Sequence, residues 1–361
     1  MLVSLRLLES IKMAGITVTT ADNLLVRIES TDGHVGWGEA ASAPTMTGEM
    51  PGGMLAAIRF MQPRLEGLDV EDLNATADQI DRFMYANEGP KSAIDMALHD
   101  LEGKRQNIPV TQILGGAQRS RIPVLWLLAA NDAAADVTAA RRKADEGFVA
   151  FKVKVGIATV EKDLERCAAV RQALGKGPRI SADANQGFSR VQAIEFARGA
   201  FQAGLDFIEQ PVDGRDLEGM AAVASASPVA VGADEGVHRL EDVERHHTMR
   251  AASGASLKTI KLGGLSAVMK AGQRMDALGM SVNLAGKMAD SSLASTAISH
   301  LAAALPQLDW DLSPTCQYLR DDIATEPLRI DRGHVHCSDR PGLGIDIDEA
   351  AVTRFRLRTQ D

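Results

Sequence analysis

The chain has 361 residues, of which 45% are hydrophobic and 24% are charged, an ordinary composition for a globular protein with a large core. Its 39 Lys and Arg residues and 48 Asp and Glu residues give a net charge of −9, which argues against a nucleic-acid-binding or membrane-binding protein. Three widely spaced cysteines indicate neither a disulfide framework nor a zinc cluster. Because we find no signal-peptide pattern and no apolar run of bilayer length, we expect a cytoplasmic protein.

The first third of the chain has the pattern of an α+β module. Two alternating runs in residues 23–40 flank Asp32-Gly33, a strong signal for a β-hairpin. Helical patterns follow at about 53–66, 71–84 and 90–106. The tail is strand-like and then rich in Gly and Pro, so we expect it to pack on this module. We therefore predict a capping domain of residues 1–118 that is completed by about 328–361.

From about residue 120 the pattern changes to short apolar runs, each followed by an amphipathic helical stretch, as in a parallel sheet with helical crossovers. The predicted strands are 122–128, 148–155, 179–183, 205–209, 229–234, 256–261, 280–285 and 308–312. Eight such strands favour a closed (β/α)8 TIM barrel over an open sheet, and we place this α/β barrel in residues 119–327.

Five consecutive predicted strands carry an ionisable residue at or near their C-terminal ends. These residues follow one another at intervals of 24 to 29 positions, about the length of one strand, one helix and a return loop: Lys154, Asp183, Glu209, Asp234 and Lys258. The C-terminal strand ends of a barrel converge on one mouth, where active sites lie. We therefore expect the five side chains to point into a common volume.

The three acidic members, Asp183, Glu209 and Asp234, predict a metal site. Three carboxylates in one barrel mouth would repel one another and resist desolvation unless a cation joined them. Oxygen ligands without His or Cys suit a hard ion, with Mg²⁺ as the first choice and Mn²⁺ as the second. The alternative is that each is an ordinary polar residue at the start of a loop.

The lysines Lys154 and Lys258 flank this carboxylate cluster and are candidates for proton transfer. A free lysine has a pKa of about 10.4 and is a poor base at neutral pH. A neighbouring ammonium group and a divalent ion both disfavour the charged form, and Lys152, on the same strand face as Lys154, supplies such a neighbour. Alternatively, these lysines are structural partners of the acids.

Together, these motifs resemble the enolase superfamily, specifically its muconate lactonising enzyme subgroup. The resemblance covers nearly the whole chain and rests on "FKVKVG", "ADANQG", "IEQP", "ADEG", "LKTIKLGGLSA" and "SAIDMALHDLEGKRQNIPVTQILGG". It implies a modified (β/α)7β barrel with an α+β capping domain built from both chain ends. It also implies a metal-dependent isomerase that removes the proton α to a carboxylate, with Mg²⁺ stabilising the enediolate.

Position by position, the resemblance implies roles for six residues. Asp183, Glu209 and Asp234 would be the metal ligands. Lys154 and Lys258 would be the acid/base pair on opposite faces of the substrate, and Lys152 would contact the substrate carboxylate. The mandelate racemase branch uses a histidine after the seventh strand, but "NLAGKMADSS" has none, so the two-lysine branch is preferred.

The specific reaction is less constrained by the sequence. Two active lysines permit racemisation or epimerisation, whereas one permits muconate-type cycloisomerisation or β-elimination. Asp309 and Asp311 in "LDWDLSP" resemble an acidic pair that holds an ammonium group in dipeptide epimerases, with Trp310 as an alternative cation–π face. This pair favours racemisation or epimerisation of an amino-acid derivative or dipeptide.

Other parts of the binding site are also expected from the resemblance. Asp290 is a predicted substrate-binding residue, at a position where many relatives carry Glu. The expected specificity loops, 12–22 and 42–54, have no Arg to bind a distal anion. The predicted partner is a small carboxylate substrate, with no nucleic acid or membrane, and we expect a homo-oligomer. A Schiff-base lyase and a non-catalytic relative are the competing hypotheses.

Overall fold

The computed structural model describes residues 1–13, 16–70 and 72–357, and its centre is an eight-stranded parallel sheet. In spatial order the strands run from β5 to β12: β5 (Leu125–Leu128), β6 (Ala150–Lys154), β7 (Arg179–Asp183), β8 (Phe207–Glu209), β9 (Ala230–Ala233), β10 (Gly254–Leu257), β11 (Ser281–Ala285) and β12 (Leu312–Ser313). A parallel bridge between Val124 and Leu312 joins the last strand to the first. The sheet is therefore closed into a barrel.

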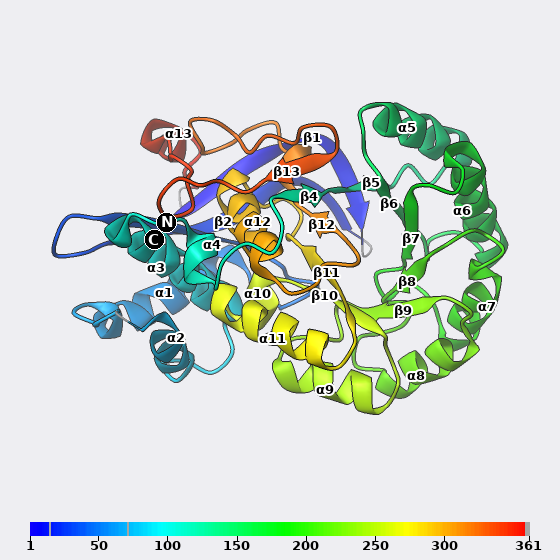
Figure 1. Ribbon diagram of the computed structural model, residues 1–361, viewed down its shortest axis with the longest axis horizontal. Helices are drawn as coiled ribbons and strands as arrows, with labels where there is room; N and C mark the ends of the chain where they lie inside the picture. The colour runs from blue at the N-terminus through cyan, green and yellow to red at the C-terminus, as the bar shows by residue number, and fades with distance from the viewer. Residues whose placement is uncertain (14–15, 71, 358–361) are drawn as a thin grey trace.

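Helices connect the barrel strands and lie around the outside of the barrel, as Figure 1 shows. They are α5 (Ala133–Asp145), α6 (Val160–Leu174), α7 (Arg190–Ala200), α8 (Leu217–Ala226), α9 (Leu240–Thr248), α10 (Thr259–Leu262), α11 (Leu265–Ala277) and α12 (Ser292–Ala304). In the described chain, β12 leads into the short 3-10 turn η1 (Cys316–Tyr318) rather than a long helix. This confirms the predicted modified (β/α)7β barrel.

The capping domain is an antiparallel sheet covered by helices, on the left of Figure 1. Its sheet contains β1 (Leu2–Met13), β2 (Ile16–Glu29) and β3 (Val35–Ala41), and its helices are α1 (Pro51–Leu65), α2 (Leu73–Asp81), α3 (Glu88–Gln106) and α4 (Val110–Ile113). The predicted hairpin at Asp32-Gly33 is present between β2 and β3. An α+β capping domain is thus confirmed.

The C-terminal tail lies against both parts of the molecule. Strand β13 (His334–His336) pairs with β4 (Arg121–Pro123), which immediately precedes the barrel. Helix α13 (Glu349–Arg354) follows, and Leu357 N then donates a hydrogen bond to Leu2 O at 3.0 Å. None of the helices in the described ranges is long and apolar enough to cross a membrane.

Buried acidic residues of the cap bind the N-termini of barrel helices. Asp95 on α3 accepts hydrogen bonds from Leu265 N at 2.6 Å and Ser266 Oγ at 3.0 Å, at the start of α11. Glu39 on β3 accepts from Ser291 N and Ala294 N, at the start of α12. Because free N–H groups and the helix dipole favour a carboxylate at a helix N-terminus, these contacts hold the cap in place over the barrel.

The approach of β3 to α3 depends on glycine. A Cβ atom added at Gly38 would lie 1.9 Å from Ala93 O and 2.8 Å from Ala97 N. We predict that Gly38→Ala lowers the free energy of unfolding by about 1 to 3 kcal/mol or more, because the backbone atoms it meets cannot move independently. Urea denaturation measures the change.

Gly53→Ala provides the matched control, since nothing lies within 4 Å of its added Cβ and it is inside α1. We expect Gly53→Ala to be neutral or stabilising by up to about 1 kcal/mol. Equal stability of the Gly38→Ala protein and the wild type would show that the packing of β3 on α3 is looser than described.

Candidate active site

The structure brings the five ionisable residues of the strand ends together. Strands β6, β7 and β8 end at Lys154, Asp183 and Glu209, and Lys154 pairs in register with Asp183, which in turn pairs with Glu209. Asp234 and Lys258 directly follow β9 and β10. All five, with Lys152, line one cavity of about 80 Å³ at the C-terminal mouth of the barrel.

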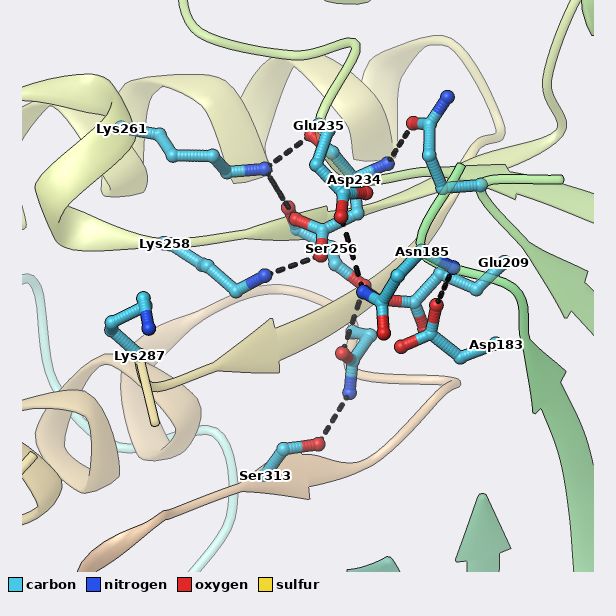
Figure 2. A network of polar contacts seen from close by, with 12 residues as sticks. Asp183, Asn185, Glu209, Asp234, Glu235, Ser256, Lys258, Lys261, Lys287 and Ser313 are labelled. Carbon is cyan, nitrogen blue, oxygen red and sulfur yellow. Dashed lines mark hydrogen bonds and ion pairs between the residues drawn. The ribbon is translucent and has the colours of Figure 1, made fainter. Parts of the chain in front are cut away.

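Each predicted carboxylate forms an ion pair with a different lysine. Lys154 Nζ is 2.5 Å from Asp183 Oδ2, and Lys152 and Lys258 form ion pairs with Glu209 and Asp234. Figure 2 shows part of this network, which extends across neighbouring strand ends. The pairing balances charges that would be costly to bury alone.

The electrostatic field of the cluster holds two of these lysines in the charged form. Burial opposes the charge on Lys152, but Glu209 and Asp183 outweigh this effect and raise its pKa above the ordinary value. Burial also opposes the charge on Lys258, and attraction to Asp234 again raises the pKa. In this arrangement Lys258 is a weak base, so proton transfer requires that its carboxylate partner be bound to something else.

The carboxylates respond differently to the same burial. Burial disfavours ionisation of Asp183, but Lys154 and Lys152 bring its pKa below the usual range. Burial of Asp234 is likewise outweighed by Lys258 and Lys261, so its pKa is lowered. The pKa of Glu209 is instead raised, because burial is the largest effect there. The Asp234 side of the site therefore carries a fixed negative charge.

Sequence reasoning missed Lys261, which is fully buried behind this cluster. Its Nζ donates to Asp234 Oδ1 at 2.7 Å, to Asp234 O at 2.5 Å and to Ser256 O at 2.9 Å. The sequence pattern suggested a strand over 256–261, whereas β10 ends at Leu257 and α10 turns Lys261 back toward Asp234. Lys261 orients Asp234 and does not itself line the cavity.

Asn185, Ser256 and Glu235, which the sequence analysis did not single out, connect neighbouring strand ends. Asn185 accepts a hydrogen bond from Lys154 and donates to Glu235 Oε1 at 3.1 Å. Ser256 Oγ donates a hydrogen bond to Glu209 Oε1 at 2.9 Å. Burial, together with repulsion from Asp234, raises the pKa of Glu235 to about 7. These neighbours fix the orientation of the lining side chains (Figure 2).

The predicted acidic pair Asp309 and Asp311 is not in the site, and this prediction is wrong. Both residues precede β12, at the N-terminal end of the barrel, opposite the mouth. Asp311 is buried in an ion pair with Arg179, the first residue of β7, and Asp309 is exposed. Trp310 stacks on Phe207 with ring centroids 4.1 Å apart. The error arose because the segment 308–312 is a turn that closes the barrel floor, and only its last residue is in the strand.

Asp290 lies behind the cavity wall. Its Oδ2 accepts a hydrogen bond from Lys287 N at 2.9 Å, and its N donates to Thr315 Oγ at 2.9 Å. Burial is the main cause of a pKa well above the usual range for Asp290, and Glu39 adds repulsion. Asp290 thus shapes the loop after β11, and a direct contact with substrate stays a prediction.

The two expected specificity loops differ in how they lie relative to the cavity. In 42–54, Met46 lines the cavity. In 12–22, residues 14–15 lie outside the described residues, and the part from Ile16 belongs to β2 rather than to a loop. A wider hollow of about 1150 Å³ shares Leu127 and Tyr318 with the cavity and extends along β1.

The donor set of the mouth fits a hard cation. Asp183, Glu209 and Asp234 are all buried and supply only oxygen ligands. In the described ranges, no three His, Cys, Asp or Glu side chains are grouped closely enough to hold a metal ion. At the mouth, each of the three carboxylates forms an ion pair with a lysine instead. Metal binding would therefore require lysines and carboxylates to separate.

Comparison with known proteins identifies the family. Residues 2–115 match the model of the mandelate racemase / muconate lactonizing enzyme N-terminal domain, and residues 135–351 match that of the enolase C-terminal domain-like family. The chain belongs to the mandelate racemase/muconate lactonizing enzyme family. The resemblance to the enolase superfamily found in the sequence is thus confirmed.

Similar proteins, one of them with a solved structure, match nearly the whole length of the chain. A muconate lactonizing enzyme from Pseudomonas fluorescens, crystallised with muconolactone, is 31% identical with a TM-score of 0.95, covering 99% of this chain and 97% of that one. Muconate cycloisomerase 1 from Pseudomonas putida is 32% identical over 354 residues, covering 96% of this chain and 94% of the relative. The L-Ala-D/L-Glu epimerase of Clostridium acetobutylicum is 31% identical, covering 95% and 96%. These relatives are isomerases, and the chain is an isomerase of this family.

The buried contact between Lys261 and Asp234 makes a prediction about stability. Lys261→Met leaves Asp234 without its inner partner, so we expect a loss of about 3 to 5 kcal/mol in the free energy of unfolding. Chemical denaturation followed by circular dichroism measures this loss.

Lys270→Met is the matched control because Lys270 forms only an exposed ion pair with Asp78 at 3.1 Å. That substitution should change stability by less than about 1 kcal/mol. Similar effects of the two substitutions would contradict the structural role given to Lys261.

Proposed function

We propose that the protein transfers the proton at the α-carbon of a small carboxylate substrate through an enediolate. The observation that carries the proposal is the position of Lys154 and Lys258, which line one cavity from β6 and from the end of β10, with three strands between them in the barrel wall. Lysines on opposite sides of a bound substrate can act as base and acid at the same carbon. Lys152, which lies on β6 with Lys154 and also lines the cavity, would bind the substrate carboxylate.

We further propose that Asp183, Glu209 and Asp234 hold Mg²⁺, with Mn²⁺ as a substitute. Bound there, the ion would stabilise negative charge on the substrate carboxylate. Its ligands would then no longer be available to Lys154 and Lys258. Without carboxylate partners, buried lysines lose the attraction that keeps them charged and become effective bases near neutral pH.

Cycloisomerisation is the reaction class that the relatives favour. Muconate and chloromuconate cycloisomerases are among the curated relatives at 30 to 32% identity over almost the whole chain. The initial argument for an amino-acid substrate loses its support, because Asp309 and Asp311 are at the wrong end of the barrel. Racemisation or epimerisation is the second candidate, since both lysines are present and an epimerase is a similar relative.

Proton exchange tests the chemistry independently of the substrate's full reaction. We predict that the enzyme with Mg²⁺ incorporates solvent deuterium at the α-carbon of muconolactone or of an N-acyl amino acid, as measured by NMR. Lys154→Ala and Lys258→Ala should each reduce this exchange by about 100-fold or more, because general acid–base groups contribute that much.

Lys162→Ala is the control for these substitutions, because Lys162 is an exposed residue of α6. Its exchange rate should equal that of the wild type. Exchange that survives both cavity substitutions would refute a two-lysine mechanism, and borohydride trapping of an adduct at Lys154 would favour the Schiff-base alternative.

Metal dependence can be measured without substrate. Adding Mg²⁺ to chelator-treated protein should raise the melting temperature, since a ligand that binds only the folded state stabilises it. Asp183→Asn and Glu209→Gln should abolish this shift, whereas Asp206→Asn, an exposed carboxylate at the other end of β8, should retain it. An unchanged shift in Asp183→Asn and Glu209→Gln would place the ion elsewhere.

A further inference from the structure

A buried arginine joins the helices that follow the first two barrel strands. Arg166 on α6 is 5% exposed, and its guanidinium contacts two buried carboxylates, Asp136 on α5 and Asp163 on α6. Arg166 Nη2 donates to Asp136 Oδ2 at 2.7 Å, and Nη1 donates to Asp163 Oδ1 at 2.9 Å. None of these three residues lines the catalytic cavity, and the proposed proton transfer gives them no role.

Each carboxylate uses its second oxygen to bind the loop that leads into its own helix. Asp136 Oδ1 accepts a hydrogen bond from Ala130 N at 3.1 Å, two residues after the end of β5. Asp163 Oδ2 accepts one from Gly156 N at 2.8 Å, two residues after the end of β6. The two contacts are therefore equivalent in successive strand-helix units. They differ in one respect, because of these two strands only β6 ends in a lysine of the site.

The course of the chain after Lys154 is also fixed by the neighbouring strand β7. Val155 N donates a hydrogen bond to Asp183 O at 2.9 Å. Gly156 has a φ of +87°, and a Cβ atom added there would lie 3.1 Å from a backbone oxygen at the start of the loop after β7. This is a left-handed conformation in a close approach of two loops, which glycine adopts without strain. Asp163 binds the N–H group of that glycine.

Arg166 gives the carboxylate of Asp163 one orientation. Both oxygens of Asp163 are bonded, one to the guanidinium and one to Gly156 N. An arginine presents its donors in a rigid planar fork, which suits a carboxylate held in a fixed position. Burial raises the pKa of Asp163 above its usual range, and the bonds from Gly156 and Arg166 oppose that effect. Arg166 thus holds Asp163, and Asp163 holds the loop after β6.

A fixed position of this loop matters because the side-chain partners of Lys154 are not permanent under the proposed function. In the structure, Lys154 Nζ donates to Asp183 Oδ2 at 2.5 Å and to Asn185. When Asp183 binds a cation, the lysine loses this ion pair, and its direction then depends more strongly on the backbone at the end of β6. Misplacing a reacting group by about 1 Å costs about 100-fold in rate.

We propose that Asp163 is a positioning residue of the reaction, which holds the end of β6, and thereby Lys154, through its hydrogen bond to Gly156 N. Arg166 keeps Asp163 in the orientation that this bond needs. Neither Asp163 nor Arg166 touches a reacting atom in this account. The inference rests on the proposed function, because it takes Lys154 to be a residue that moves the proton.

The kinetics of α-deuterium exchange separate positioning from substrate binding. For the Mg²⁺-loaded enzyme with muconolactone, we expect Asp163→Ala to lower kcat for exchange by about tenfold or more and to change KM by less than about twofold. Asp163→Asn keeps an oxygen that accepts from Gly156 N, so its kcat should lie within about threefold of the wild-type value. Exchange rates at several substrate concentrations, followed by NMR, give both constants.

Asp136→Ala is the matched control. It removes the other carboxylate partner of Arg166, at a similarly buried position, and leaves the bond between Asp163 and Gly156 in place. Both alanine substitutions should lower the free energy of unfolding in chemical denaturation, because each leaves a buried charge with one partner fewer. The kcat of Asp136→Ala should nevertheless stay within about threefold of the wild-type value.

A double-mutant cycle shows whether Asp163 acts through Lys154. In a Lys154→Ala background, Asp163→Ala should change the remaining exchange rate by less than about twofold, because no lysine is left at this strand end to be positioned. A role in stability alone predicts the same loss in both backgrounds.

Chemical labelling gives a readout that does not depend on turnover. Lys152 is on the same strand as Lys154, two residues before it, and serves as the internal reference. Acetic anhydride labelling of the full chain, followed by peptide mass spectrometry, measures both lysines. The rate for Lys154 relative to Lys152 should rise by about threefold or more in Asp163→Ala and stay unchanged in Asp136→Ala. General loosening of the barrel would raise both rates together.

Four results would overturn the proposal. They are a wild-type kcat in Asp163→Ala, an equal loss of kcat in Asp163→Ala and Asp136→Ala, a loss that persists in the Lys154→Ala background, and an unchanged labelling ratio in Asp163→Ala. Failure of the proposed function would instead appear as absence of α-deuterium exchange in the wild-type enzyme. The labelling ratio would still test the position of Lys154 in that case, so the two failures are distinguishable.

Discussion

The pairing of buried lysines with buried carboxylates at the barrel mouth is the interaction on which the rest of the structure depends. Buried Lys152, Lys258 and Lys261, with half-buried Lys154, form ion pairs with the buried carboxylates Asp183, Glu209 and Asp234. Each isolated charge at such depth would cost several kcal/mol, so neither set could be buried without the other. The barrel makes this possible by ending successive parallel strands at one level, and the cap covers the mouth through carboxylates bound to the N-termini of α11 and α12.

The same pairing explains why a metal and the lysines would act together. A lysine held charged by a carboxylate is a poor base, and a carboxylate held by a lysine is not free to bind a cation. Occupation of Asp183, Glu209 and Asp234 by a divalent ion would change both conditions at once. Catalytic competence would thus follow from exchanging one set of partners for another. Lys261, which holds Asp234 and does not line the cavity, would keep that ligand oriented throughout.

Much of this could be predicted from the sequence, because alternating and helical periodicity fix the order of elements and the regular spacing of ionisable residues fixes which of them share the mouth. The positions of the residues at the floor of the barrel could not be predicted in this way. Asp309 and Asp311 have the spacing of a binding pair, but barrel closure between Val124 and Leu312 determines that they precede the strand. Lys261 was equally hidden, since only the folded turn after β10 distinguishes it from a solvated lysine.

We propose that a divalent cation, when it binds at the mouth, takes the three carboxylates from the lysines. The most direct measurement is a crystal structure of the protein with Mn²⁺, located by its anomalous scattering. We predict one Mn²⁺ ion bound by oxygens of Asp183, Glu209 and Asp234, with Lys154 and Lys258 separated from them and directed into the cavity. A mouth that holds no Mn²⁺ at saturating concentration, with Lys154 still on Asp183 and Lys258 still on Asp234, would contradict it.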